Sequence, residues 1–160
     1  MVDHPFKRIT ILLCALCQLS TPAIANPTST RLHFIFPSNT KSILLGCDRM
    51  TVYVVHDAKP IHGKVIPKFR GYVIDKTIKI RSASGRKAIV QAVMSAVTDP
   101  TASEAECFMP GFAIRVDRGS KRLDLLICFD CHSVETFSGN SFGRGPISNL
   151  AFPCLQAATR

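Results

Sequence analysis

The feature that most constrains the fold is the run Leu123–Phe129, the most apolar stretch of the chain outside its N-terminus. The segment before it, Phe112–Val116, alternates apolar residues with polar or small ones, and the connection between the two has Gly119 at its centre. Two such segments around a glycine-containing turn predict a β-hairpin. The continuous apolar run of the second segment predicts a strand that is buried on both faces.

The hairpin also predicts which cysteines lie close together. Folding it about Gly119 makes the numbers of facing residues sum to about 239, which places Ala113 opposite Leu126. Continued beyond Pro110, the same register brings Cys107 near Cys131, within the Cα separation that a disulfide tolerates. We therefore expect a Cys107–Cys131 disulfide first and a Cys107–Cys128 disulfide second.

Other segments predict a small α+β domain with a mostly antiparallel sheet and one main helix. Apolar residues at helical spacing predict that helix at about 86–97, capped by Ser82 or Ser84 and ended before Pro100. Runs rich in β-branched and aromatic residues predict the further strands. These strands are expected at residues 32–36, 50–55, 72–74, 77–80 and 134–137.

The N-terminus has the pattern of a secretory signal peptide at residues 1–25. Lys7 and Arg8 precede an apolar core, and Ala23-Ile24-Ala25 is a small-x-small cleavage site before Asn26. We therefore expect an exported protein, periplasmic or secreted, without a membrane span once the signal is removed. The remaining chain divides into a lead-in at 26–47, an α+β core domain at 48–137 and an irregular tail at 138–160.

Export changes what the cysteines are expected to do. Five remain after cleavage, at positions 47, 107, 128, 131 and 154. An oxidising compartment favours disulfides, so Cys47–Cys154 is the natural second pair beside Cys107–Cys131. One cysteine is then left over.

The motif Cys128-x-x-Cys131-His132 admits three other kinds of chemistry. It has the spacing of a c-type haem attachment, of a thiol-redox pair and, together with Cys107, of a zinc site. In a continuous strand, however, residues three apart are about 10 Å apart and on opposite faces. Haem and a redox pair both need a turn or a helix there, and zinc needs reduced thiols. These remain alternatives to a structural disulfide.

The charge of the chain indicates what kind of partner the protein could bind, but it does not indicate a reaction. The net charge of +9 becomes +8 when Asp3, Lys7 and Arg8 leave with the signal peptide. This balance favours anionic surfaces or polyanions. Export and the absence of tryptophan argue against nucleic acid. The sequence has no phosphate-binding glycine loop and no Gly-x-Ser-x-Gly elbow, so it points away from those enzyme classes.

Several segments together resemble a group of exported bacterial proteins of uncharacterised function. The group has a strand that ends in Ile-Cys-Phe-Glu-Cys and, upstream, a Cys-Phe-x-Pro-Arg-His-Gly segment. The resemblance covers about residues 48–137. It is carried by Phe69-Arg70-Gly71-Tyr72, the helix at 86–97, Cys107-Phe108-x-Pro110-Gly111 and Asp124–Cys131.

This chain departs from that pattern at two places. Asp130 stands where the group has glutamate, and the Arg-His pair after Pro110 is absent. The resemblance implies no known activity. The resulting hypothesis is an exported, disulfide-stabilised binding or structural domain, for which the sequence favours a non-enzymatic role but leaves catalysis open. The alternative is a thiol-redox or haem electron-transfer protein.

Overall fold

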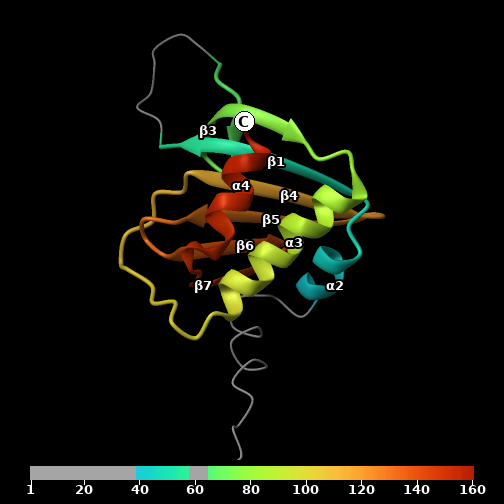
Figure 1. Cartoon of the computed structure of the whole chain (residues 1–160). Helices are drawn as coiled ribbons and strands as arrows, with labels where there is room; N and C mark the ends of the chain where they lie inside the picture. The colour runs from blue at the N-terminus through green and yellow to red at the C-terminus, as the bar shows by residue number, and fades with distance from the viewer. Residues whose placement is uncertain (1–38, 58–64) are drawn as a thin grey trace, which may run out of the picture.

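Seven strands form one antiparallel sheet in the computed structural model, which describes residues 39–57 and 65–160. Their order is β2-β3-β1-β4-β5-β6-β7 (Figure 1). The strands are β1 (Arg49–His56), β2 (Lys68–Phe69), β3 (Tyr72–Lys79), β4 (Phe112–Arg118), β5 (Lys121–Cys128), β6 (Ser133–Ser138) and β7 (Ser141–Pro146). The fold is therefore α+β and dominated by its sheet. The predicted signal peptide and the predicted strand at 32–36 lie outside the described residues.

The β4–β5 hairpin has the predicted register. Ala113 faces Leu126 and Asp117 faces Arg122. β5 lies between β4 and β6 and is buried from Leu123 to Cys128. Its position inside the sheet explains why an almost uninterrupted apolar sequence is needed there.

The main helix, α3 (Ala83–Thr98), packs across one face of the sheet (Figure 1). It begins three residues before the predicted start, because Ser82 caps it: the Ser82 hydroxyl accepts a hydrogen bond from the Gly85 N–H at 3.1 Å. Its buried residues, which include Val93 and Val97, join the core beneath it. Within the described ranges no helix is both long and apolar enough to span a lipid bilayer.

The expectation of one main helix is only loosely supported, since shorter helices accompany α3, and the segment 138–160 is not an irregular tail. The lead-in contains α2 (Thr40–Leu45), and the segment 138–160 forms β7, the 3-10 helix η1 (Asn149–Ala151) and α4 (Phe152–Ala158). Ile147, Ala151 and Leu155 are fully buried in the same core as α3. The glycine- and serine-rich sequence of this segment does not predict a strand. β7 pairs with β6 through its backbone and lacks a run of apolar side chains.

The sheet curls strongly toward the face that does not carry α3. In a flat sheet, β2 and β6 would be about 24 Å apart, because five steps of roughly 4.8 Å separate them. Yet the guanidinium of Arg70, in the β2–β3 turn, lies 4.6 Å from the centre of the Phe137 ring on β6. A β-bulge in β1 between Val54 and Val55 supports this curvature. We call the face toward which the sheet curls the inner face.

Candidate functional site

Three arginines on the inner face each lie over a phenylalanine ring. The pairs and their distances are Arg70–Phe137 at 4.6 Å, Arg115–Phe69 at 4.8 Å and Arg144–Phe108 at 5.1 Å. A guanidinium over an aromatic ring is attracted by the electron density of the ring face. We call these six residues the Arg–Phe face. They come from distant parts of the sequence and meet because the sheet curls.

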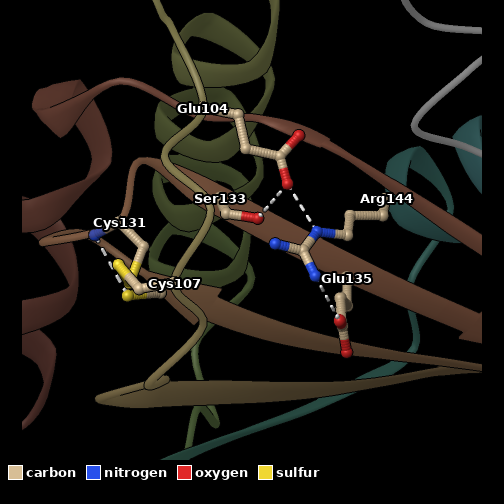
Figure 2. The surroundings of a disulfide bond; sticks show 7 residues. Glu104, Cys107, Cys131, Ser133, Glu135 and Arg144 are labelled. Atoms are coloured by element: carbon tan, nitrogen blue, oxygen red, sulfur yellow. Dashed lines mark hydrogen bonds and ion pairs between the residues drawn. A yellow bond between two sulfur atoms is a disulfide. The ribbon is translucent and has the colours of Figure 1, made fainter.

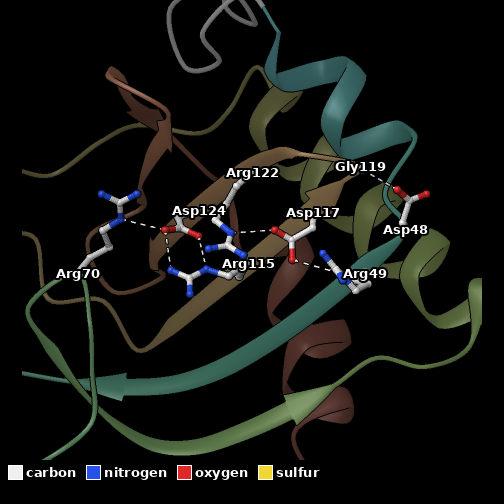
Figure 3. Close-up of polar contacts among 8 residues, drawn as sticks. All are labelled: Asp48, Arg49, Arg70, Arg115, Asp117, Gly119, Arg122 and Asp124. Carbon is white, nitrogen blue, oxygen red and sulfur yellow. Dashed lines mark hydrogen bonds and ion pairs between the residues drawn. The ribbon is translucent and has the colours of Figure 1, made fainter.

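Asp124 anchors two of these arginines (Figure 3). Its carboxylate is only 1% exposed and accepts bonds from Arg115 Nε at 2.8 Å and Nη2 at 3.0 Å. Arg70 Nε donates to the same carboxylate at 2.9 Å. A buried carboxylate needs such partners, since an unpaired charge is costly away from water. The hydrogen bond to Asp124 is also the largest reason why the pKa of Arg115 is raised.

The backbone of Arg70 is held in an unusual conformation. Its φ is 51°, in the left-handed region, and Gly71 follows with φ 98°. This two-residue turn between β2 and β3 normally prefers Asn-Gly. The two terminal nitrogens of Arg70 point away from Asp124 (Figure 3) and have no hydrogen-bond partner among the described residues. The side chain is 38% exposed, so the turn presents a fixed cation whose terminal N–H groups are unpaired within the described part of the chain.

A second charged group surrounds Arg144 on β7 (Figure 2). Its Nε donates to Glu104, and its Nη1 lies 3.5 Å from Glu135. Glu104 also accepts from the Ser133 hydroxyl at 2.9 Å. Burial raises the pKa of Glu135, an effect that Arg144 opposes and Glu104 reinforces. Glu135 therefore takes up a proton more readily than an ordinary glutamate.

Tyr72 interacts electrostatically with the second charged group. Its pKa is raised by burial first and by the negative charge of Glu135 second, whereas Arg144 acts in the opposite direction. Its hydroxyl has no hydrogen-bond partner among the residues that the structure describes. Tyr72 follows the Arg70-Gly71 turn directly and faces Phe69 in the pairing of β2 with β3.

The disulfide joins Cys107 to Cys131, with 5.6 Å between their Cα atoms. The strand predicted at Leu123–Phe129 is β5, which ends at Cys128, and residues 129–132 form a tight turn. His132 closes it with a left-handed φ of 50°. The turn brings the Cys131 N–H to 3.1 Å from the Cys128 sulfur.

The expected Cys47–Cys154 disulfide is absent, and both residues are free thiols. They lie on different sides of α3. Cys47 lines a cavity with Val90, whereas Cys154 lines another with Ala88, and these two helix positions point in opposite directions. Burial raises the pKa of both thiols.

The ligand sets considered for zinc and haem are not assembled. The Cys131 sulfur, which both would need, is bonded to Cys107. His132, the remaining candidate ligand, lies in the turn after Cys131. Among the described residues, no three histidine, cysteine or acidic side chains are grouped as a metal would require.

Of the residues of the Arg–Phe face, the sequence suggests only Phe69 and Arg70 as a possible lining of a site, and it favours a surface loop there. The sequence does not single out the other four residues as a site. The segments that carry the resemblance contribute to this face and to its anchor. Phe69 and Arg70 come from the first segment, Phe108 from the second, and Asp124, which anchors two of the arginines, from the third. Comparisons of the chain with protein-family models, with curated proteins and with solved structures each gave no match.

Proposed function

We propose that the protein is an exported, disulfide-stabilised binding domain that holds a carboxylate- or phosphate-bearing ligand on the Arg–Phe face. The observation that carries the proposal is Arg70, a cation fixed by Asp124 and Phe137 whose two terminal nitrogens have no partner among the described residues. The pattern of residues 1–25 supports export, and the Cys107–Cys131 disulfide is consistent with an oxidising compartment.

The chemistry of arginine favours an oxyanion as the ligand. A guanidinium offers parallel N–H donors that match the two oxygens of a carboxylate or phosphate. Asp124 neutralises one of its two arginine partners, so this group keeps one net positive charge. Because Asp124 and Phe137 already hold Arg70 in place, little conformational entropy is lost when the ligand binds.

The same groups favour binding over catalysis. Arginine stays protonated at any physiological pH, so Arg70, Arg115 and Arg144 can orient a charge but cannot transfer a proton. Their aromatic partners offer flat apolar surface beside the charge. A ligand with an anionic group on a planar or apolar body matches this combination best.

Isothermal titration calorimetry tests the proposal with citrate and pyrophosphate as small probes, at low ionic strength. Arg70→Ala should weaken binding at least about tenfold, because one hydrogen bond to a charged group is typically worth 1.5–3 kcal/mol. Arg122→Ala is the matched control. Arg122 also donates from Nε to a carboxylate, that of Asp117 at 2.8 Å, but it has no phenylalanine beneath it in the described structure.

The control separates a built site from general attraction to a basic protein. Binding that falls equally in both variants, or that is absent with both probes, contradicts the proposal. Flotation with phosphatidylglycerol vesicles distinguishes a lipid head group from a free anion as the source of the ligand. Loss of vesicle binding in Arg70→Ala alone would assign the face to a lipid head group.

A further inference from the structure

A cluster of three cysteines lies at the end of β5, outside the Arg–Phe face. Cys107 and Cys131 form the disulfide, and the third, Cys128, is a free thiol. Cys128 and Cys131 are fully buried, whereas Cys107 lies on an exposed segment. Thiol–disulfide exchange within a protein requires a free thiol close to a disulfide, and these three cysteines provide both.

The turn at 129–132 places Cys128 against the residue that it would attack. Its sulfur accepts a hydrogen bond from the Cys131 N–H at 3.1 Å. This bond holds the Cys128 sulfur beside Cys131.

We propose that Cys128 exchanges with the Cys107–Cys131 disulfide, so that the bond moves reversibly to Cys128–Cys131. The Cys128 thiol gives its proton to water, and its thiolate attacks the Cys131 sulfur. A Cys128–Cys131 bond forms as the Cys107–Cys131 bond breaks. The electron pair of the broken bond leaves on the Cys107 sulfur, which takes up a proton. One disulfide and one thiol are present before and after, so no oxidant or reductant is consumed.

The exchange has a structural consequence for the segment that carries Cys107. The same segment carries Glu104 and Phe108, both of which contact Arg144. The disulfide ties this segment covalently to the turn, beside a hydrogen bond from the Ala105 N–H to the Cys131 carbonyl at 3.0 Å. After exchange only non-covalent contacts hold the segment. Cys107 becomes an exposed thiol that can exchange with an external disulfide, which forms a mixed disulfide and releases the other half of that compound as a thiol.

Peptide mapping after alkylation tests the exchange in the protein purified from the periplasm. The Cys47→Ser/Cys154→Ser background removes the two free thiols beside α3. Iodoacetamide at pH 8, followed by acid quenching, traps whichever thiol is exposed. We expect the label to accumulate on Cys107 together with a Cys128–Cys131 linked peptide. Label confined to Cys128, or no label while the protein stays folded, overturns the proposal.

Two variants in the same background make the result specific. Cys128→Ser removes the attacking thiol, so Cys107 should remain unlabelled and linked to Cys131; equal labelling of Cys107 in this variant overturns the proposal. Cys107→Ser leaves only the pair that the exchange would join. Oxidised glutathione should convert that pair to a Cys128–Cys131 disulfide, with circular dichroism confirming the fold. Two thiols that persist in the folded variant contradict the inference.

Discussion

Asp124 and Asp117 show how burial decides the role of a carboxylate. Both lie on the β4–β5 hairpin, and each pairs with two arginines. Asp124 is 1% exposed, whereas Asp117 is 15% exposed and lies near the hairpin turn (Figure 3). A buried charge depends on its partners far more than one that water can reach. The ion pairs of Asp124 should therefore contribute more to the stability of the fold than those of Asp117.

Asparagine substitutions should separate these two carboxylates. Asp124→Asn leaves the charges of Arg70 and Arg115 without their counter-ion, so we expect the free energy of unfolding to fall by about 3 kcal/mol. Asp117→Asn should change it by no more than about 1 kcal/mol, since water replaces part of the lost interaction. Urea unfolding followed by circular dichroism measures both values. Equal losses would show that Asp124 is not a special anchor.

Glu135 should make stability depend on pH. Its raised pKa means that the folded protein still holds a proton at pH values where the unfolded chain has lost it. The contribution of Glu135 to the free energy of unfolding is therefore fully present below the ordinary pKa of 4.5. This contribution is lost as the pH rises through the pKa that Glu135 has in the folded protein. The stability of Glu135→Gln minus that of the wild type should rise across this window. A constant or falling difference contradicts the assignment.

Part of this residue-scale picture could be read from the sequence. The register sum that pairs Ala113 with Leu126 also places Arg115 opposite Asp124, an acid within an otherwise apolar strand. That pairing is a usable signal for a buried ion pair. Arg70 gave no such signal, because its contact with Asp124 depends on the curl of the sheet and on a left-handed residue that is not glycine.

Secondary-structure elements were predictable where local chemistry fixes them. α3 has both an apolar face and the Ser82 cap, and both were visible in the sequence. The turn at 129–132 was not visible, since it needs a left-handed residue and His132 occupies that position. The amino-acid sequence of residues 129–132 is compatible with either a strand end or a tight turn, and tertiary packing decides between the two.

The cap can be tested with neighbouring serines. Ser82→Ala removes the acceptor for the Gly85 N–H and should lower the free energy of unfolding by about 1 kcal/mol. Ser84→Ala lies inside the helix and should cost nothing measurable, because alanine is the better helix former. Thermal unfolding of the two variants gives the comparison. A greater loss of stability in Ser84→Ala than in Ser82→Ala would show that Ser84 caps the helix instead of Ser82.

The C-terminal segment can be tested as an element of the core. Leu155 in α4 is fully buried, whereas Leu150 in η1 is 59% exposed. Leu155→Ala should lower the free energy of unfolding by about 2–5 kcal/mol through lost burial and the cavity that remains. Leu150→Ala should change it by less than about 0.5 kcal/mol. Similar small effects on stability in both variants would show that residues 138–160 do not pack into the core.

At the scale of the whole molecule, curvature of the sheet creates the candidate site. Hairpin registers are local and can be deduced from turns and periodicity, as β4 and β5 show. Curvature depends on the bulge at Val54 and Val55 and on packing between strands distant in sequence. The sequence therefore predicts the strands that carry Arg115 and Asp124, but not that the β2–β3 turn meets β5 and β6 across the inner face.

An NMR titration tests the central claim most directly, because it locates the bound anion. The Nε–Hε signals of Arg70, Arg115 and Arg144 report on the Arg–Phe face, whereas those of Arg81 and Arg86 report on the basic N-terminal region of α3. With pyrophosphate added at low ionic strength, we expect saturable shifts at Arg70 and its two neighbours on the face. Shifts confined to Arg81 and Arg86, or shifts that never saturate, would contradict an anion site on the inner face.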